Sequence, residues 1–132
     1  MAGLRRIFRL KTASRILAWS CILAVAFLSL TPAEQMLRTG FGGRVEHVLA
    51  YAATGFITGL AFAERGLLRV ILALVAYAGG LEFLQRFSPG RILSIEDFMF
   101  SGTGVLVGVG ALALLARWLP GLTEPDGQVL SR

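Results

Sequence analysis

Charged and amide side chains crowd around one turn in the second half of the chain, between two long apolar runs. Glu82 and Gln85 end the first of these runs, Arg91 and Asp97 precede the second, and the turn at 88–90 joins them. If both runs are helices that cross a bilayer, the hairpin brings these groups to one membrane surface. Ionisable groups there are unfavourable unless they are paired or hydrated, so this concentration of them indicates a functional site.

The only histidine of the chain, His47, stands at the start of another apolar run. Its ring titrates near physiological pH, so it can act as a general acid or base. Asp97 can orient His47 or pair with Arg91, whose planar guanidinium suits a phosphate or a carboxylate. We predict two sets of site residues: the catalytic candidates are His47, Glu82 and Asp97, and the ligand-binding candidates are Tyr51, Gln85, Arg91 and Ser101.

The same residues also allow interpretations without this chemistry. Buried charges must find partners, so a pair such as Glu82 with Arg91 can simply fix the packing of helices. Tyr51 is also typical of an aromatic anchor at a membrane interface. A divalent metal held by His47, Glu82 and Asp97 is a minor alternative, because carboxylate-rich sites suit such ions. We predict no metal and no cofactor.

Composition places the chain in a membrane. Of its 132 residues, 55% are hydrophobic and only 16% are charged, whereas soluble domains average about a quarter charged. The net charge of +5 would favour nucleic-acid binding in a soluble protein. Here the basic residues flank apolar runs, as charges that set membrane topology do, so we expect no nucleic-acid partner. The single cysteine, Cys21, excludes an internal disulfide framework.

The apolar runs predict an all-α fold, a four-transmembrane-helix bundle made of two helical hairpins. The predicted spans are residues 13–30, 44–63, 67–86 and 98–118, each near the length that a bilayer requires. We expect three parts: a basic cytoplasmic N-terminus at 1–12, the four-helix domain at 13–118 and a flexible cytoplasmic tail at 119–132. The first run also resembles a signal-peptide core, but no clear Ala-x-Ala cleavage site follows it, which favours an uncleaved helix.

Two helical faces carry small or polar residues. His47, Tyr51, Thr54 and Thr58 share one face of the second span, and this face is expected to turn inward. On the fourth span, Gly104-x-x-x-Gly108 is a small-residue motif that lets membrane helices approach closely.

Basic residues predict the orientation. With the N-terminus in the cytoplasm, nine basic residues face inward and four face outward, and this bias favours both termini inside an inner, cytoplasmic membrane. The inward residues are Arg5, Arg6, Arg9, Lys11, Arg15, Arg65, Arg69, Arg117 and Arg132, and the outward residues are Arg38, Arg44, Arg86 and Arg91. The polar hairpin and His47 then face outward together.

Three groups of residues resemble the VanZ-like family of small polytopic membrane proteins. They are Ser29-Leu30-Thr31-Pro32, then His47-x-x-x-Tyr51, and finally Glu82-x-x-Gln85 with Pro89-Gly90-Arg91 and Asp97 through Gly104 and Gly108. Ser101 stands where the family usually has Asn, and Gly43-Arg44 stands where Asp-Lys is usual. The resemblance implies a membrane location and a connection to the cell envelope and to teicoplanin, a glycopeptide antibiotic, but it supplies no reaction.

The sequence therefore supports three functions. The first is binding or handling of a lipid-linked or phosphate-bearing envelope precursor, or modulation of glycopeptide susceptibility. The second is a membrane hydrolase or phosphotransferase acting on a polyprenyl phosphate, so whether the protein is an enzyme stays open. The third is a scaffold in which polar residues only lock helix packing. The lipid bilayer is the expected partner, and homo-oligomerisation stays open.

Overall fold

Four long helices carry almost all of the described chain. The computed structural model describes residues 2–35 and 40–118, with side chains from residue 11 onward. The elements in order are α1 (Ala2–Leu30), the 3-10 turn η1 (Ala33–Gln35), α2 (Gly43–Ala61), the 3-10 turn η2 (Ala63–Arg65), α3 (Leu67–Gln85) and α4 (Ile95–Trp118). The all-α prediction is confirmed within these ranges, which contain no strand. The predicted tail at 119–132 lies outside the described residues.

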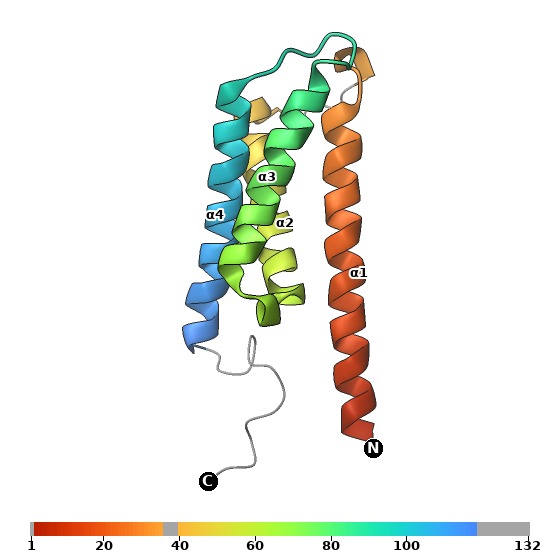
Figure 1. The fold of residues 1–132 in the computed structure, drawn as a ribbon, viewed down its shortest axis with the longest axis vertical. Helices are drawn as coiled ribbons and strands as arrows, with labels where there is room; N and C mark the ends of the chain where they lie inside the picture. Colours follow the sequence, from red (N-terminus) through yellow and green to blue (C-terminus); the bar gives the residue numbers. More distant parts are fainter. Residues whose placement is uncertain (1, 36–39, 119–132) are drawn as a thin grey trace.

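The helices run alternately up and down, so the start of α1 and the end of α4 lie at the same end of the bundle (Figure 1). We call this the terminal end, and we call the opposite end, which holds the α1–α2 and α3–α4 connections, the cavity end. α1 begins at Ala2 and not near residue 13, so the basic N-terminal residues continue the first helix instead of forming a separate segment. At about 1.5 Å per residue, its 29 residues reach roughly 43 Å, which is longer than a bilayer core.

α2 and α4 run parallel and pack most closely, because glycines let their backbones approach. A Cβ atom on Gly108 would collide with the Ala52 carbonyl, and one on Gly104 would lie 2.5 Å from the Val48 carbonyl. Gly55 of α2 lies against the backbone of Val105 in the same way. The small-residue motif of α4 is therefore the contact surface for α2, as its spacing predicts.

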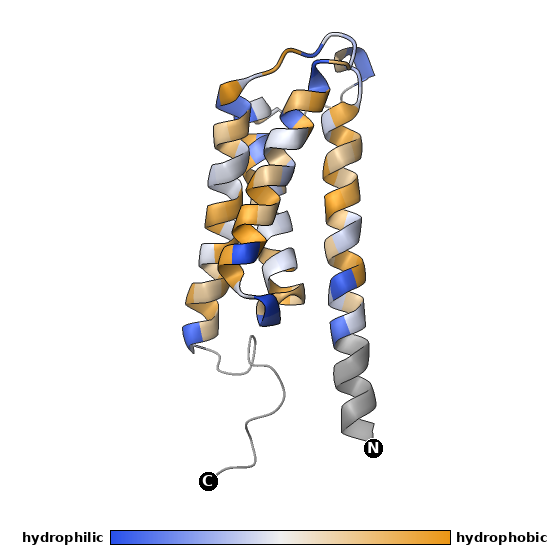
Figure 2. Cartoon of the chain, viewed as in Figure 1, coloured by the Kyte–Doolittle hydropathy of each residue, from blue (hydrophilic) through white to orange (hydrophobic). Residues whose placement is uncertain are grey.

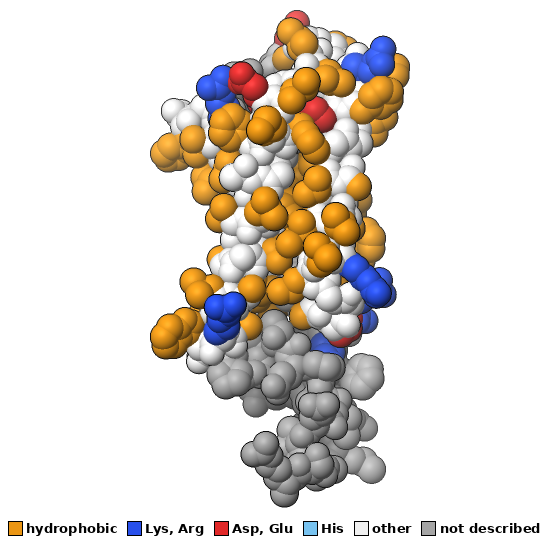
Figure 3. Space-filling view, turned by 60° about the vertical axis from the view of Figure 1, so that its left-hand side comes forward, with side chains coloured by type: hydrophobic (Ala, Val, Ile, Leu, Met, Phe, Trp, Pro, Cys, Tyr) orange, Lys and Arg blue, Asp and Glu red, His pale blue; other side chains and the backbone are white. Residues whose placement is uncertain are grey.

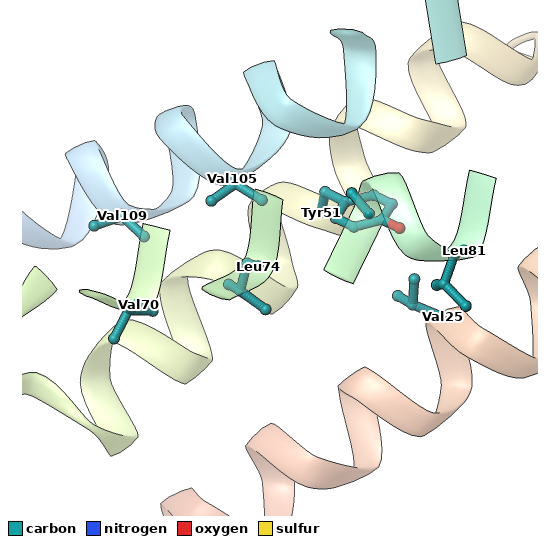
Figure 4. Packing of buried hydrophobic residues seen from close by; sticks show 8 residues of the cluster. Val25, Tyr51, Val70, Leu74, Leu81, Val105 and Val109 are labelled. Carbon is teal, nitrogen blue, oxygen red and sulfur yellow. The ribbon is translucent and has the colours of Figure 1, made fainter. Parts of the chain in front are cut away.

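Branched aliphatic side chains fill the space between α3 and the α2–α4 pair (Figure 4). Val70 and Leu74 of α3 pack with Val105 and Val109 of α4, and each of these residues is at most 5% exposed. Val25 is the residue of α1 that is buried in this cluster. α1 is therefore the most lightly packed helix of the described bundle, and polar contacts at its ends supplement its packing.

At the terminal end, α1 is held by an ion pair between Arg15 and Glu64 of η2, with 2.7 Å between Nη2 and Oε1. Arg15 also lies over the Phe62 ring. Partial burial acts to raise the pKa of Glu64, but hydrogen bonds from its own backbone N–H and from Arg15 outweigh this effect, so the pKa lies below its usual value. The contribution of this pair to stability is therefore present at neutral pH and is lost as acid protonates the carboxylate.

Three of the helices are long and apolar enough to cross a membrane: Lys11–Leu30 within α1, Leu67–Gln85 and Ile95–Trp118. The second predicted span, α2, has sufficient length but not sufficient hydropathy, because its first turns contain Arg44, Glu46 and His47 and its inner face is polar. Hydrophobic side chains cover the middle of the molecule, and charged side chains gather at its two ends (Figures 2 and 3).

Candidate functional site

A cavity of about 490 Å³ lies between α1 and α2 at the cavity end. Its wall has an apolar part and a polar part. The apolar part is lined by Val25, Phe27, Leu28 and Ala50, and the polar part includes Ser29, Thr31, Arg44, Glu46, His47, Tyr51, Arg91 and Asp97. Apolar and ionisable groups thus share one concave surface, which suits a ligand with both a polar head and an apolar tail.

His47 is held between two side chains of α4. Its Nδ1 lies 3.1 Å from the Ser101 hydroxyl, and its Nε2 lies 3.9 Å from Oδ2 of Asp97. The His47 side chain is 16% exposed and that of Asp97 is 32% exposed, so solvent or a ligand can reach both. Ser101 is only 2% exposed and is not part of the cavity wall. Ser101 therefore orients the imidazole from behind and is not placed to attack a ligand.

Tyr51 lies one helical turn after His47 and connects three helices. Its hydroxyl interacts with Ser101 of α4 and with Ser29 of α1. Tyr51 is 3% exposed, and in Figure 4 its hydroxyl points toward Val25 and Leu81. The interpretation of Tyr51 as an aromatic anchor facing the membrane interface is wrong, because the polar stripe of α2 turns this residue into the bundle.

Arg91 joins the α3–α4 loop to the end of α1. Its Nε donates to the Thr31 carbonyl at 3.2 Å, and its Nη2 donates to the Leu28 carbonyl at 3.0 Å. The last carbonyls of a helix have no partner within the helix, and a cation there also suits the helix dipole. Arg91 follows Gly90, whose φ of +72° is a conformation that glycine adopts without strain. The guanidinium thereby lies at the cavity wall.

Glu82 and Gln85 do not line this cavity. Glu82 is 5% exposed, and its Oε1 accepts a hydrogen bond of 2.9 Å from the Ser94 backbone N–H. Gln85 is 2% exposed and does not line the cavity. The pairing of Glu82 with Arg91 that the sequence suggests is replaced by backbone partners for both residues. Glu82 also does not join His47 and Asp97, and the described residues contain no group of three metal-ligating side chains.

Comparison with known proteins agrees with the motifs. The profile of the VanZ/LLP1 family matches residues 4–116, which include all four helices almost completely. The chain belongs to the VanZ/LLP1 family. No curated protein and no solved structure matches it. The resemblance carried by the three motif groups is thus confirmed, and every residue that lines the cavity falls within the matched range.

Of the seven predicted site residues, the VanZ/LLP1 fold brings five together. His47, Tyr51, Arg91 and Asp97 line the cavity, and Ser101 supports two of them from behind. Glu82 and Gln85 are buried elsewhere. The structure gives the positions of these residues, whereas their catalytic and binding roles stay predictions.

Several cavity residues of this VanZ/LLP1 protein were not among the predicted site residues, and two of them, Ser29 and Arg44, make polar contacts with other side chains. Ser29 lines the cavity and reaches the Tyr51 hydroxyl, and its signal in the sequence is its place before the helix-ending Thr31-Pro32. Arg44 also lines the cavity, and it forms an ion pair of 2.5 Å with Glu96. Its signal is its position three residues before His47, which places both on one side of a helix.

Proposed function

We propose that this VanZ/LLP1 protein crosses the inner, cytoplasmic membrane four times, with both termini in the cytoplasm and the cavity facing outward. The low hydropathy of α2 is compatible with a span, because Tyr51, Thr54 and Thr58 are buried and need no contact with lipid. The terminal end carries more basic residues than the cavity end, which favours a cytoplasmic terminal end. The described basic residues there are Lys11, Arg15, Arg65, Arg69 and Arg117, against Arg44, Arg86 and Arg91 at the cavity end.

Cysteine labelling in whole cells tests this orientation. In a Cys21→Ser background, a membrane-impermeant maleimide is expected to label Ile92→Cys, because position 92 is 84% exposed in the α3–α4 loop. Arg65→Cys, in the exposed η2 turn, is the matched control and should react only after the membrane is permeabilised. Labelling of position 65 but not position 92 in intact cells would reverse the proposed topology.

The function that the cavity supports best is binding of the phosphate-bearing head group of a lipid-linked envelope precursor. The observation that carries this is the mixed wall, in which Arg44, His47 and Arg91 share one cavity with apolar residues such as Val25, Phe27 and Leu28. Guanidinium and imidazole groups donate the charge-assisted hydrogen bonds that phosphate oxygens accept. Phe27 and Leu28 line the cavity and are largely exposed, so a long apolar tail can pass from the cavity to the lipid beside α1.

A lipid-binding assay tests this function with two probes that differ only in the head group. The purified protein is titrated with a polyprenyl phosphate and with the polyprenol of the same length, and its melting temperature is followed. The phosphate form should bind more tightly. His47→Gln should weaken binding of the phosphate by about tenfold, as expected for loss of a partly buried hydrogen-bonding partner, and the more exposed Arg44→Gln by up to about fivefold.

The matched control is Arg69→Gln, which removes the same charge at the terminal end. It should leave both affinities unchanged. Equal affinity for the polyprenol and its phosphate, or an equal loss with Arg69→Gln, would show that the cavity does not recognise a phosphate.

A second candidate function is hydrolysis or transfer of a phosphoryl group. The observation that favours it is the orientation of His47 between Ser101 and Asp97, which is typical of a general base held by neighbouring groups. The test is to incubate the purified protein with a polyprenyl diphosphate and to measure the release of inorganic phosphate. Release that falls at least about a hundredfold in His47→Gln supports an enzyme, whereas no release by the wild type leaves binding as the function.

A further inference from the structure

A second, smaller pocket of about 200 Å³ opens between α3, the α3–α4 loop and α4. It shares no residue with the cavity described above, and the inference drawn from it does not rest on the proposed function. Its wall consists of Gly79, Glu82, Phe83, Leu93, Ile95 and Phe98. Glu82 is the one ionisable side chain in an otherwise apolar and partly aromatic wall.

Within the described chain, the Glu82 carboxyl group is buried without a basic partner. It is 5% exposed, and the hydrogen bond from the Ser94 backbone N–H occupies Oε1. Among the residues that the structure describes, no Lys or Arg forms an ion pair with it. A carboxylate withdrawn from water at a membrane surface is unfavourable unless a cation approaches it. The rings of Phe83 and Phe98 beside it offer faces that attract cations.

A basic side chain, Arg86, lies against one wall residue of this pocket. Arg86 follows Glu82 by four residues, so the two side chains project from the same side of α3. The guanidinium carbon of Arg86 lies 5.2 Å from the centre of the Phe83 ring, which is part of the pocket wall, and 5.4 Å from that of Phe87. Arg86 is exposed, so its donors are available outside the pocket.

We infer that this pocket binds the head group of a zwitterionic aminophospholipid, with the primary ammonium at Glu82 and the phosphate at Arg86. The order of charges in this head group, an ammonium at its end and a phosphate closer to the acyl chains, matches the protein. The buried Glu82 is an acid and the exposed Arg86 is a base. A primary ammonium also donates hydrogen bonds to a carboxylate, whereas a trimethylammonium carries no N–H. The large exposed side chains of Leu84, Ile95 and Met99 provide apolar surface on α3 and α4 for the acyl chains.

Native mass spectrometry of the detergent-purified full chain tests this inference. The probes are phosphatidylethanolamine, phosphatidylcholine and phosphatidylglycerol with identical acyl chains. Phosphatidylethanolamine should be retained at least about tenfold more tightly than the other two. Glu82→Gln should remove this preference, because it deletes the charge but keeps the carbonyl oxygen that accepts the Ser94 N–H.

Two further variants separate the inference from a general loss of folding. Glu34→Gln removes an exposed acid that lines neither pocket and should keep the preference. Arg86→Gln, a substitution at the surface, should weaken binding of phosphatidylethanolamine but not of a long-chain alkylamine, which has no phosphate. It therefore provides a test even if Glu82→Gln fails to fold.

The inference is overturned if folded Glu82→Gln keeps the preference for phosphatidylethanolamine, or if the wild type retains phosphatidylglycerol equally well. The second result would mean that the phosphate and the acyl chains, which both lipids carry, suffice for binding without the ammonium. Soluble phosphoethanolamine distinguishes a lipid from a free ligand. It should bind far more weakly than the lipid, and equal binding would contradict a lipid site.

Discussion

Gly108→Ala is expected to lower the stability of the bundle more than any other single methyl group added to α4. The new Cβ would collide with the Ala52 carbonyl and would also approach the Ala52 carbonyl carbon and the Phe56 backbone nitrogen. These atoms belong to the backbone of α2 and cannot rotate away, so the two helices must separate. Overpacking of this kind costs about 1–3 kcal/mol or more, and no hydrophobic force restores the contact within a membrane.

The measurement is unfolding of the purified protein in detergent, and the chain supplies a matched control on the same helix. Beyond its own turn of helix, Gly110 has no neighbouring heavy atom within 4 Å of its would-be Cβ, so Gly110→Ala makes the same chemical change without a collision. It should be neutral or slightly stabilising, because alanine favours a helix by up to about 1 kcal/mol over glycine. If both variants unfold at the same point, α2 and α4 do not pack through Gly108.

Loss of Arg91 is expected to loosen α1 and to weaken ligand binding together. Arg91→Gln removes the fork that donates to the Leu28 and Thr31 carbonyls, and α1 packs lightly elsewhere. Hydrogen bonds from charged donors contribute about 1.5–3 kcal/mol, and we expect the lower end of this range because the guanidinium is partly exposed. The expected result is a lower melting temperature and a weaker response to polyprenyl phosphate.

Arg91→Lys separates these two effects. Lysine keeps the positive charge at the cavity but cannot reproduce two donors in a fixed planar geometry. It should therefore recover part of the phosphate binding while the melting temperature stays low. Arg69→Gln serves again as the control for loss of charge. An unchanged melting temperature in both Arg91 variants would mean that the other contacts of α1 hold it without help from Arg91.

The four helices and the end at which polar residues gather were predictable from the sequence. Apolar runs of membrane length separated by glycine and proline specify helices, and α2 to α4 begin and end within three residues of the predicted limits. The inward face of α2 was also predictable, because His47, Tyr51, Thr54 and Thr58 repeat with helical spacing. The exception is the start of α1, where charged residues continue the helix because Arg and Lys are good helix formers.

The grouping of the site residues was decided by the tertiary structure. α3 and α4 are apolar on almost every side, so periodicity cannot tell which gap between helices a given face meets. Close packing at Gly104 and Gly108 sets the rotation of α4, and this brings Asp97 and Ser101 to His47. The rotation of α3 turns Glu82 toward Phe98 and Ser94, in a pocket that His47 does not line. The spacing of residues along one helix is a local property that the sequence shows directly. Which neighbouring helix a given helical face contacts depends on how the backbones pack, and residues far apart in the chain determine that packing.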